Sequence, residues 1–181
     1  GDGLDDSVDP DSAGTPLADN DSDGDGFENR RDIDNDGDGI TDRVEAQSIA
    51  GYVGPVGSDG DGDGIDNSYD PDSGGSALTP LDSDGDGYAD YLDADSDNDG
   101  IADLREGNDS DSDGTEDFSV TGTDTDGDGL DDAYDTDNGG TTAPLQDTES
   151  DGKVDFRDND DDDDGIFTID EPLDFNPNNS V

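Results

Sequence analysis

Residues 93–106 read DADSDNDGIADLRE and carry six carboxylates, at Asp93, Asp95, Asp97, Asp99, Asp103 and Glu106. At a separation of about 4 Å, two like charges repel by about 4 kcal/mol at an effective dielectric constant near 20. A compact form of this segment therefore needs a positive partner, and the only basic residue within it is Arg105. We infer that a bound cation, rather than Arg105, holds these carboxylates together.

The whole chain shares this bias. It has 181 residues, a net charge of −51 and only 24% hydrophobic residues, a composition that is typical of disordered chains because burial cannot offset the entropy of ordering. However, 51 of the 57 acidic residues are aspartate, and 27 glycines are interspersed among them. Aspartate and glycine together favour tight loops that direct short carboxylates inward.

Several classes of function are disfavoured by what the chain lacks. It contains no cysteine or histidine, which argues against disulfides, zinc or iron sites and most catalytic nucleophile–base pairs. Six basic residues form no patch for nucleic acid, and no apolar run reaches the roughly 18 residues that a membrane span needs. The repetitive acids also lack the shaped cleft that a glycosidase requires. We therefore expect no enzyme activity, no nucleic-acid partner and no membrane insertion.

Three copies of a long repeat cover the chain, at residues 1–61, 62–126 and 127–181. The phrase GDGLDDSVDPDSAGTPL at 1–17 returns as GDGIDNSYDPDSGGSALTPL at 62–81 and as GDGLDDAYDTDNGGTTAPL at 127–145. We treat each copy as one structural unit. Because the chain begins at Gly1 rather than Met, we interpret it as a processed product or a fragment.

Each copy contains a finer twelve-residue unit, D-x-D-x-D-G-φ-x-[D/N]-x-x-[D/E], in which φ is usually apolar. We number its positions 1 to 12 and name each loop by its first residue: Asp21, Asp34, Asp59, Asp82, Asp95, Asp124, Asp147 and Asp160. Three pairs of loops start 13 residues apart (21 and 34, 82 and 95, 147 and 160) and so form tandem pairs. This spacing leaves no room for flanking helices, so EF-hand and dockerin arrangements are excluded for most units.

Calcium takes six to eight oxygen ligands, and a loop that offers positions 1, 3, 5, 7, 9 and 12 can surround it, position 7 through its backbone carbonyl and position 9 directly or through water. Magnesium fits less well because it demands a strict octahedron and retains its waters. Six loops fill every position: Asp21, Asp23, Asp25, Phe27, Asn29, Asp32; Asp34, Asp36, Asp38, Ile40, Asp42, Glu45; Asp59, Asp61, Asp63, Ile65, Asn67, Asp70; Asp82, Asp84, Asp86, Tyr88, Asp90, Asp93; Asp95, Asp97, Asp99, Ile101, Asp103, Glu106; Asp124, Asp126, Asp128, Leu130, Asp132, Asp135.

The remaining candidate loops depart from the pattern, and we expect weaker or water-completed sites in the third copy. Glu149 stands at position 3 of one loop, and Thr168 stands at position 9 of the other. A further unit is truncated at the start of the chain, and another lacks its closing acid. Their candidate ligands are Asp147, Glu149, Asp151, Lys153, Asp155, Asp158; Asp160, Asp162, Asp164, Ile166, Glu171; Asp2, Leu4, Asp6, Asp9; Asp109, Asp111, Asp113, Asp117.

The loops predict a mostly irregular, elongated structure stabilised by calcium. We expect helical turns within 41–50 and 101–107, short extended strands at 52–56 and 117–122, and no large hydrophobic core. The apolar residues at position 7 are enough for small satellite clusters only.

These units resemble thrombospondin type 3 repeats, particularly those of long bacterial surface proteins, in phrases such as DSDGDGYADYLDADSDNDGIADLREG (82–107) and DTDGDGLDDAYDTDNGG (124–140). The resemblance covers nearly the whole chain. It implies a string of calcium ions wrapped by backbone, with little regular secondary structure, in an extracellular or cell-surface protein. This chain lacks the cysteines of the animal members.

We expect roughly eight to ten or more Ca²⁺ ions per chain, because each loop offers one site and adjacent loops of a pair can share carboxylates. The sequons at Asn20, Asn108 and Asn178 offer attachment points for glycans, although chance explains most such matches in a chain so rich in Asn and Ser. Asp174 and Asn176 could complete the truncated Asp2 loop of another molecule and link chains head to tail.

The sequence therefore favours a calcium-loaded structural segment: a stalk, a spacer or a filament subunit. Two alternatives remain open. One is a soluble protein that sequesters calcium or nucleates mineral, and the other is a non-catalytic module of a larger secreted enzyme or adhesin.

Overall fold

The computed structural model describes residues 20–109 and 115–170. Within these ranges the backbone is mostly turns and bends, and the helices are single turns. They are α1 (Asp42–Glu45), η2 (Ile49–Gly51), η3 (Pro71–Ser73), η4 (Asp90–Leu92), α2 (Asp103–Glu106), η5 (Asp155–Arg157) and η6 (Thr168–Asp170), in which η denotes a 3-10 helix. Five of them, all except η2 and η3, occupy the last positions of a twelve-residue loop. The helical turns expected within 41–50 and 101–107 are thus confirmed.

The expected strands at 52–56 and 117–122 are wrong, since no strand is present in the described ranges. Their backbone donors are used by side chains instead. The amides of Val56 and Gly57 donate to the Asp66 carboxylate at 3.1 and 2.7 Å, and the amide of Thr121 donates to Asp131 at 3.0 Å. The amides that donate to these carboxylates are not available for a strand ladder.

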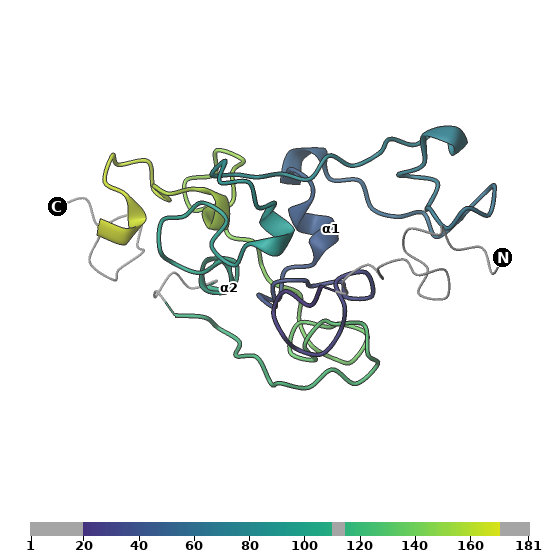
Figure 1. Ribbon diagram of the computed structural model, residues 1–181. Coiled ribbons are helices and arrows are strands. Elements are labelled where there is room, and N and C mark those ends of the chain that lie inside the picture. The colour runs from purple at the N-terminus through teal and green to yellow at the C-terminus, as the bar shows by residue number, and fades with distance from the viewer. Residues whose placement is uncertain (1–19, 110–114, 171–181) are drawn as a thin grey trace, which may run out of the picture.

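Equivalent elements of successive copies pack in the same way. Helix α1 of the first copy packs against η4 of the second, and α2 of the second copy packs against η5 of the third. In Figure 1 these elements occupy the middle of the molecule, with the loop of residues 59–70 towards one end and η6 towards the other. The same type of contact therefore joins the first copy to the second and the second to the third.

A small apolar cluster joins the first copy to the third. It consists of Ile40, Ala143, Val154 and Phe156, with Val44 and Leu145 packed against it. The described residues form no large core, as expected. However, this cluster is not a satellite confined to a single loop, because it joins two copies. Contacts between copies, more than 100 residues apart in sequence, bury its side chains.

The side chain of Arg157 ties all three copies together. Its exposed fraction is 6%, and its Nε donates to Asp90 of the second copy at 2.6 Å. Its two terminal nitrogens donate to backbone carbonyls of the first copy, to Gln47 at 3.1 Å and to Glu45 at 2.5 Å. The guanidinium also lies 4.6 Å from the centre of the Phe156 ring. One buried cation thus satisfies acceptors from two other copies.

Candidate metal-binding loops

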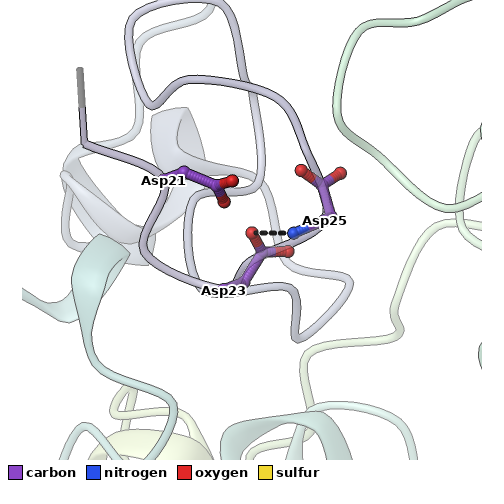
Figure 2. Close-up of side chains that lie close together, drawn as sticks. All are labelled: Asp21, Asp23 and Asp25. Carbon is purple, nitrogen blue, oxygen red and sulfur yellow. Dashed lines mark hydrogen bonds between the residues drawn. The ribbon is translucent and has the colours of Figure 1, made fainter.

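In four of the loops the first three carboxylates converge on one point. In Figure 2, Asp21, Asp23 and Asp25 surround a common centre, and the Asp25 amide donates to Asp23 at 3.2 Å. One oxygen from each of these residues lies within 4.8 Å of the others. The same holds for positions 1, 3 and 5 of three further loops: Asp34, Asp36, Asp38; Asp59, Asp61, Asp63; Asp82, Asp84, Asp86.

Backbone hydrogen bonds hold these carboxylates in place. In the Asp59 loop the amides of Gly62 and Gly64 donate to the two oxygens of Asp59, at 2.7 and 3.0 Å. The amide of Ile65, at position 7, donates to Asp63 at 2.8 Å. The ring of carboxylates is therefore a product of local backbone geometry within one loop.

Two left-handed backbone positions make this geometry accessible. Positions 4 and 6 have positive φ, as at Gly62 (82°) and Gly64 (98°). Where position 4 is not glycine, the residue still adopts this conformation, as Asn98 (58°) and Asp163 (57°) do. Asn and Asp tolerate left-handed backbone better than most residues, which explains why the motif survives there.

Position 9 closes each loop upon itself. In the Asp95 loop the Asp103 amide donates to the carbonyl of Ala94 at 3.1 Å, and the Asp103 carboxylate accepts from the amide and the hydroxyl of Ser96, at 2.8 and 2.6 Å. Loops with Asn29, Asp42, Asn67, Asp90, Asp132 and Asp155 at this position repeat the bond to the amide of position 2. Position 9 thus makes hydrogen bonds that hold the loop closed, a role that the sequence analysis did not predict when it assigned this position as a metal ligand.

Position 12 differs between the two loops of a pair. In the first loops, Asp32, Asp93 and Asp158 each accept a hydrogen bond from the amide that begins the next loop, at 2.9–3.2 Å. In the second loops of the first two copies, neither carboxylate oxygen of Glu45 or Glu106 accepts a hydrogen bond from a described residue. Both glutamates are buried. Their oxygens are therefore left for a ligand.

The most enclosed cluster spans two copies. Asp38 and Glu45 of the Asp34 loop and Asp103 of the Asp95 loop each bring an oxygen within 4.8 Å of the others, and all three are buried. Asp38 Oδ2 also accepts no hydrogen bond from a described residue. Sequence analysis placed Asp103 in its own loop only, because nothing in a local motif reveals a neighbour 58 or more residues away.

Burial raises the pKa of these carboxyl groups. Desolvation, reinforced by neighbouring carboxylates, raises the pKa of Asp34 and of Asp36 to about 8 and that of Glu106 to about 12. Desolvation also raises the pKa of Asp103 to about 8, and those of Asp38 and Glu45 well above their usual values. Buried carboxylates become anionic at neutral pH only if a cation offsets the lost hydration.

The loops of the third copy keep the geometry but change the chemistry. Desolvation raises the pKa of Glu149, at position 3, to about 7. Lys153 Nζ lies 3.2 Å from Asp158 at position 12, so an internal cation already neutralises one ligand of this loop. In the Asp160 loop the Thr168 hydroxyl replaces the carboxylate at position 9 and accepts from the Asp161 amide at 3.1 Å.

The sequence analysis did not identify two aspartates that shape the loops. Asp66 and Asp131 occupy position 8 of the two loops that lack a tandem partner. Both accept hydrogen bonds from amides of the segment that precedes their loop. Several hydrogen bonds to the Asp66 carboxylate lower its pKa to about 2. The signal was present, because both copies carry Asp at this position and the tandem loops do not.

The residues at position 7 fall into two groups. Ile40, Ile101 and Leu130 are buried, whereas Ile65, Tyr88 and Ile166 are exposed.

Some predicted ligands lie outside the described residues: Asp2, Leu4, Asp6, Asp9, Asp111, Asp113 and Glu171. For the incomplete unit that begins at Asp109, the Asp117 amide donates to the Asn108 carbonyl at 2.7 Å, which repeats the closure at position 9.

The donor set of these loops suits hard cations. It consists of carboxylate, amide and hydroxyl oxygens in rings and contains no nitrogen or sulfur ligand, a combination that calcium prefers among biological metals.

The described residues include no helix long and apolar enough to cross a membrane. A scan against protein-family models found no match, and a search of curated proteins found no relative.

Proposed function

We propose that this protein is an extracellular calcium-binding structural segment, a stalk, spacer or filament subunit whose tandem loops become rigid when they bind Ca²⁺. The observation that carries the proposal is Glu45. Its side chain is fully buried, both of its carboxylate oxygens lack a hydrogen-bond donor among the described residues, and it faces Asp38 and Asp103. A buried, unpaired carboxylate costs several kcal/mol, and a divalent cation is the group that would offset this cost.

The choice of calcium rests on the shape of the loops. Position 12 would close each site, with two oxygens where it is glutamate, and the ring of positions 1, 3 and 5 supplies three more ligands. With positions 7 and 9 added, a loop that ends in glutamate offers seven oxygens, which exceeds the six that magnesium accepts. The similarity to thrombospondin type 3 repeats supports the same ion and an extracellular or cell-surface location, where millimolar calcium suits sites of modest affinity.

Charge balance supports a large number of ions. Eight divalent cations would cancel 16 of the 51 net negative charges, so a compact chain benefits from every loop that fills. We propose about eight to ten or more ions per chain. The loops of the third copy would be the weakest, because Lys153 pairs with the ligand Asp158 and Thr168 replaces a carboxylate there. Glycans at the sequons would add no charge of their own to this balance unless they are acidic.

Calcium titration of the chelator-treated protein tests the proposal. We expect saturable binding of several ions by isothermal calorimetry, together with a decrease in the radius of gyration by small-angle X-ray scattering. Excess chelator should reverse both changes, and magnesium at the same concentration should reproduce neither fully. Scattering and circular dichroism that ignore both calcium and chelator would refute the proposal.

The rival proposal is a soluble calcium-sequestering or mineral-nucleating protein, which the net charge favours. It needs the same loops but no defined arrangement of the copies. Electron microscopy of the calcium-loaded protein distinguishes the two, because a structural segment gives particles of uniform shape or filaments and a sequestering protein gives dispersed particles of varied shape. A role as a non-catalytic module of a larger secreted enzyme or adhesin would instead show as attachment to a further domain in the full precursor.

A further inference from the structure

The packing between copies has an open end. The helix that closes the second loop of one copy packs against the helix that closes the first loop of the next, as α1 does with η4 and α2 with η5. Continuing this relation, η6 of the third copy would pack against the segment that closes the first loop of a following copy. In this sequence that segment recurs at residues 29–31, in the first copy.

The environment of Arg157 shows what such a junction contains. Arg157 occupies position 11 of its loop and pairs with Asp90, which is position 9 of the corresponding loop one copy earlier. Ser83 holds the Asp90 side chain in place, because its amide and hydroxyl donate to the two carboxylate oxygens of Asp90 at 2.8 and 2.9 Å. The Arg157 guanidinium of the following copy then donates to the same carboxylate.

The same arrangement of an acid at position 9 and the residue that holds it recurs one copy later. Asp155 corresponds to Asp90, and Thr148 presents it in the same way, through its amide at 2.8 Å and its hydroxyl at 2.7 Å. A pocket opens beside Asp155, and its lining residues are Arg105, Glu106, Asp109, Gln146, Thr148, Asp155 and Asp161.

Two of the lining residues are the repeat equivalents of residues that accept hydrogen bonds from Arg157. Glu106 corresponds to Glu45, whose carbonyl accepts from Arg157, and Asp155 corresponds to Asp90. The pocket carries four carboxylates against the single positive charge of Arg105. Its Asp161 Oδ1 is buried and accepts no hydrogen bond from a described residue. The charge of the pocket therefore suits a second guanidinium.

The residue that would fill this pocket is present at the other end of the series. Arg31 occupies position 11 of the first loop of the first copy, the place that Arg157 takes in the third, and its side chain is exposed. An arginine occurs at position 11 of the first loop only in the copies where the residue that it meets, or would meet, is acidic. In the second copy position 11 is Leu92, and the residue that it would meet, Asn29, is neutral; Arg157 meets Asp90, and Arg31 would meet Asp155.

Exposed apolar residues lie on two surfaces that the packing between copies leaves uncovered, one beside η6 and the other in the Asp59 loop. Ile166, beside η6, has an exposed fraction of 49%, whereas its equivalents Ile40 and Ile101 have 2% and 6%. Ile65 in the Asp59 loop has 45%, whereas its equivalent Leu130 has 6%. Leu130 belongs to a loop that meets the first tandem pair, where the Ile33 amide donates to the Asp128 carbonyl at 3.0 Å. An additional copy in the same register would cover both exposed positions.

We propose that two molecules of this protein associate end to end by repeating the internal packing of the copies, with Arg31 of one molecule seated in the acidic pocket between Glu106 and Asp155 of the other. In this assembly η6 packs against residues 29–31 of the second molecule. The proposal rests on the proposed calcium-bound state of the loops, because the calcium-free carboxylates around the pocket would not hold this form at neutral pH. The junction is directional, so repeating it builds a filament.

The first test compares three calcium-loaded proteins by sedimentation velocity and light scattering over a range of concentrations. The unaltered protein should assemble into multiples of 18.7 kDa. Arg31→Ala should weaken association at least about 30-fold, since it leaves a buried carboxylate without its cation. The control Arg43→Ala removes the same charge from an exposed residue of α1 and should associate normally. A protein that stays monomeric, or an Arg31→Ala variant that assembles like the unaltered protein, overturns the proposal.

The second test uses the direction of the junction. Arg31→Ala disables one end, and Gln146→Lys disables the other by placing a positive charge in the pocket. Each variant alone should stay monomeric, and an equimolar mixture should form a dimer that grows no further. Assembly of either variant alone, including assembly through the Asp2 and Asp174 segments, would show that this junction is not the one used.

Calcium titration of every variant separates this proposal from the proposed function. Variants that bind calcium like the unaltered protein but do not follow the expected pattern of association overturn the junction alone. Failure of all of them, and of the unaltered protein, to bind calcium removes the basis of both proposals.

Discussion

At the scale of single residues, the loops combine two kinds of constraint that a twelve-residue motif can encode. The carboxylates at positions 1, 3 and 5 accept nearby amides and still direct oxygens towards a shared centre. Glycine, Asn or Asp supplies the left-handed turns between them. Because every one of these contacts lies within a few residues, the loop needs little from the rest of the fold to take its shape.

Glu45→Gln should reduce the affinity of one calcium site at least about tenfold, because it keeps the size of the side chain but removes one negative charge from a buried set of ligands. Calorimetry should show one fewer strong site. The matched control is Glu116→Gln, which changes the same group at an exposed position that is not a predicted ligand and should leave the titration unaltered. An identical result for both variants would contradict the role given to Glu45.

Gly140→Ala should destabilise the calcium-loaded protein by more than about 1 kcal/mol, because a Cβ there would lie 2.2 Å from the carbonyl oxygen of Asp132. The neighbouring Gly139 has a φ of 93° and open space around it, so Gly139→Asn, which tolerates this conformation, serves as the control. Thermal unfolding in saturating calcium measures both. Equal melting temperatures for the two variants would exclude a close approach at Gly140.

At the scale of elements, the short helices position one copy against the next. Five of them end candidate metal-binding loops, and four of these five also make contacts between copies, α1 with η4 and α2 with η5. The cluster of Asp38, Glu45 and Asp103 joins α1 to α2 in this way. Binding an ion there would stabilise the loop and the contact between copies together, which couples local order to tertiary order.

Arg157→Met should destabilise the calcium-loaded protein by about 3–5 kcal/mol, because the methionine fills much of the volume but leaves the buried Asp90 carboxylate without its cation. Chemical unfolding in saturating calcium measures this change. Arg43→Met, which alters an arginine at an exposed site, should stay within about 0.5 kcal/mol of the unaltered protein. A small effect for both would mean that Arg157 does not tie the copies together.

At the scale of the whole molecule, the burial of like charges governs stability. Asp34, Asp36 and Asp103 have pKa values of about 8, well above the 3.8 expected for unfolded chain, and desolvation is the principal cause. Between these two values the folded protein binds more protons than the unfolded one, so without metal its stability falls as pH rises. Calcium replaces those protons, so its affinity should rise with pH over the same window.

The metal-free protein should therefore be more compact at pH 5 than at pH 8, and calcium should restore compactness at pH 8. Small-angle scattering in excess chelator across this range, followed by calcium addition, measures both effects. Urea unfolding at the two pH values provides a control for aggregation near the isoelectric point of about 4.1. A metal-free protein that is more compact at pH 8 would contradict this account of the buried carboxylates.

The limits of sequence reasoning follow from the distance between interacting residues. The helical turns after the second loops were predictable, because their apolar spacing and loop register are local. The strands at 52–56 and 117–122 were predicted wrongly, because alternating apolar residues do not reveal that Asp66 and Asp131 occupy the donors of these segments. The hydrogen bond between the position 9 side chain and the position 2 amide could not be predicted for a similar reason. In a sequence motif, an acid that binds a metal cannot be distinguished from an acid that accepts a hydrogen bond from an amide.

By itself, the sequence determined the shape and chemistry of each loop, because the ligands, the left-handed turns and the closing bonds all fall within twelve residues. It also showed that the loops recur in three copies. Only the tertiary structure decided how these copies pack, since Arg157 reaches acceptors 67 to 112 residues away and Asp103 joins a loop of another copy. Such contacts depend on where the chain returns in space, which no pattern confined to one loop can specify.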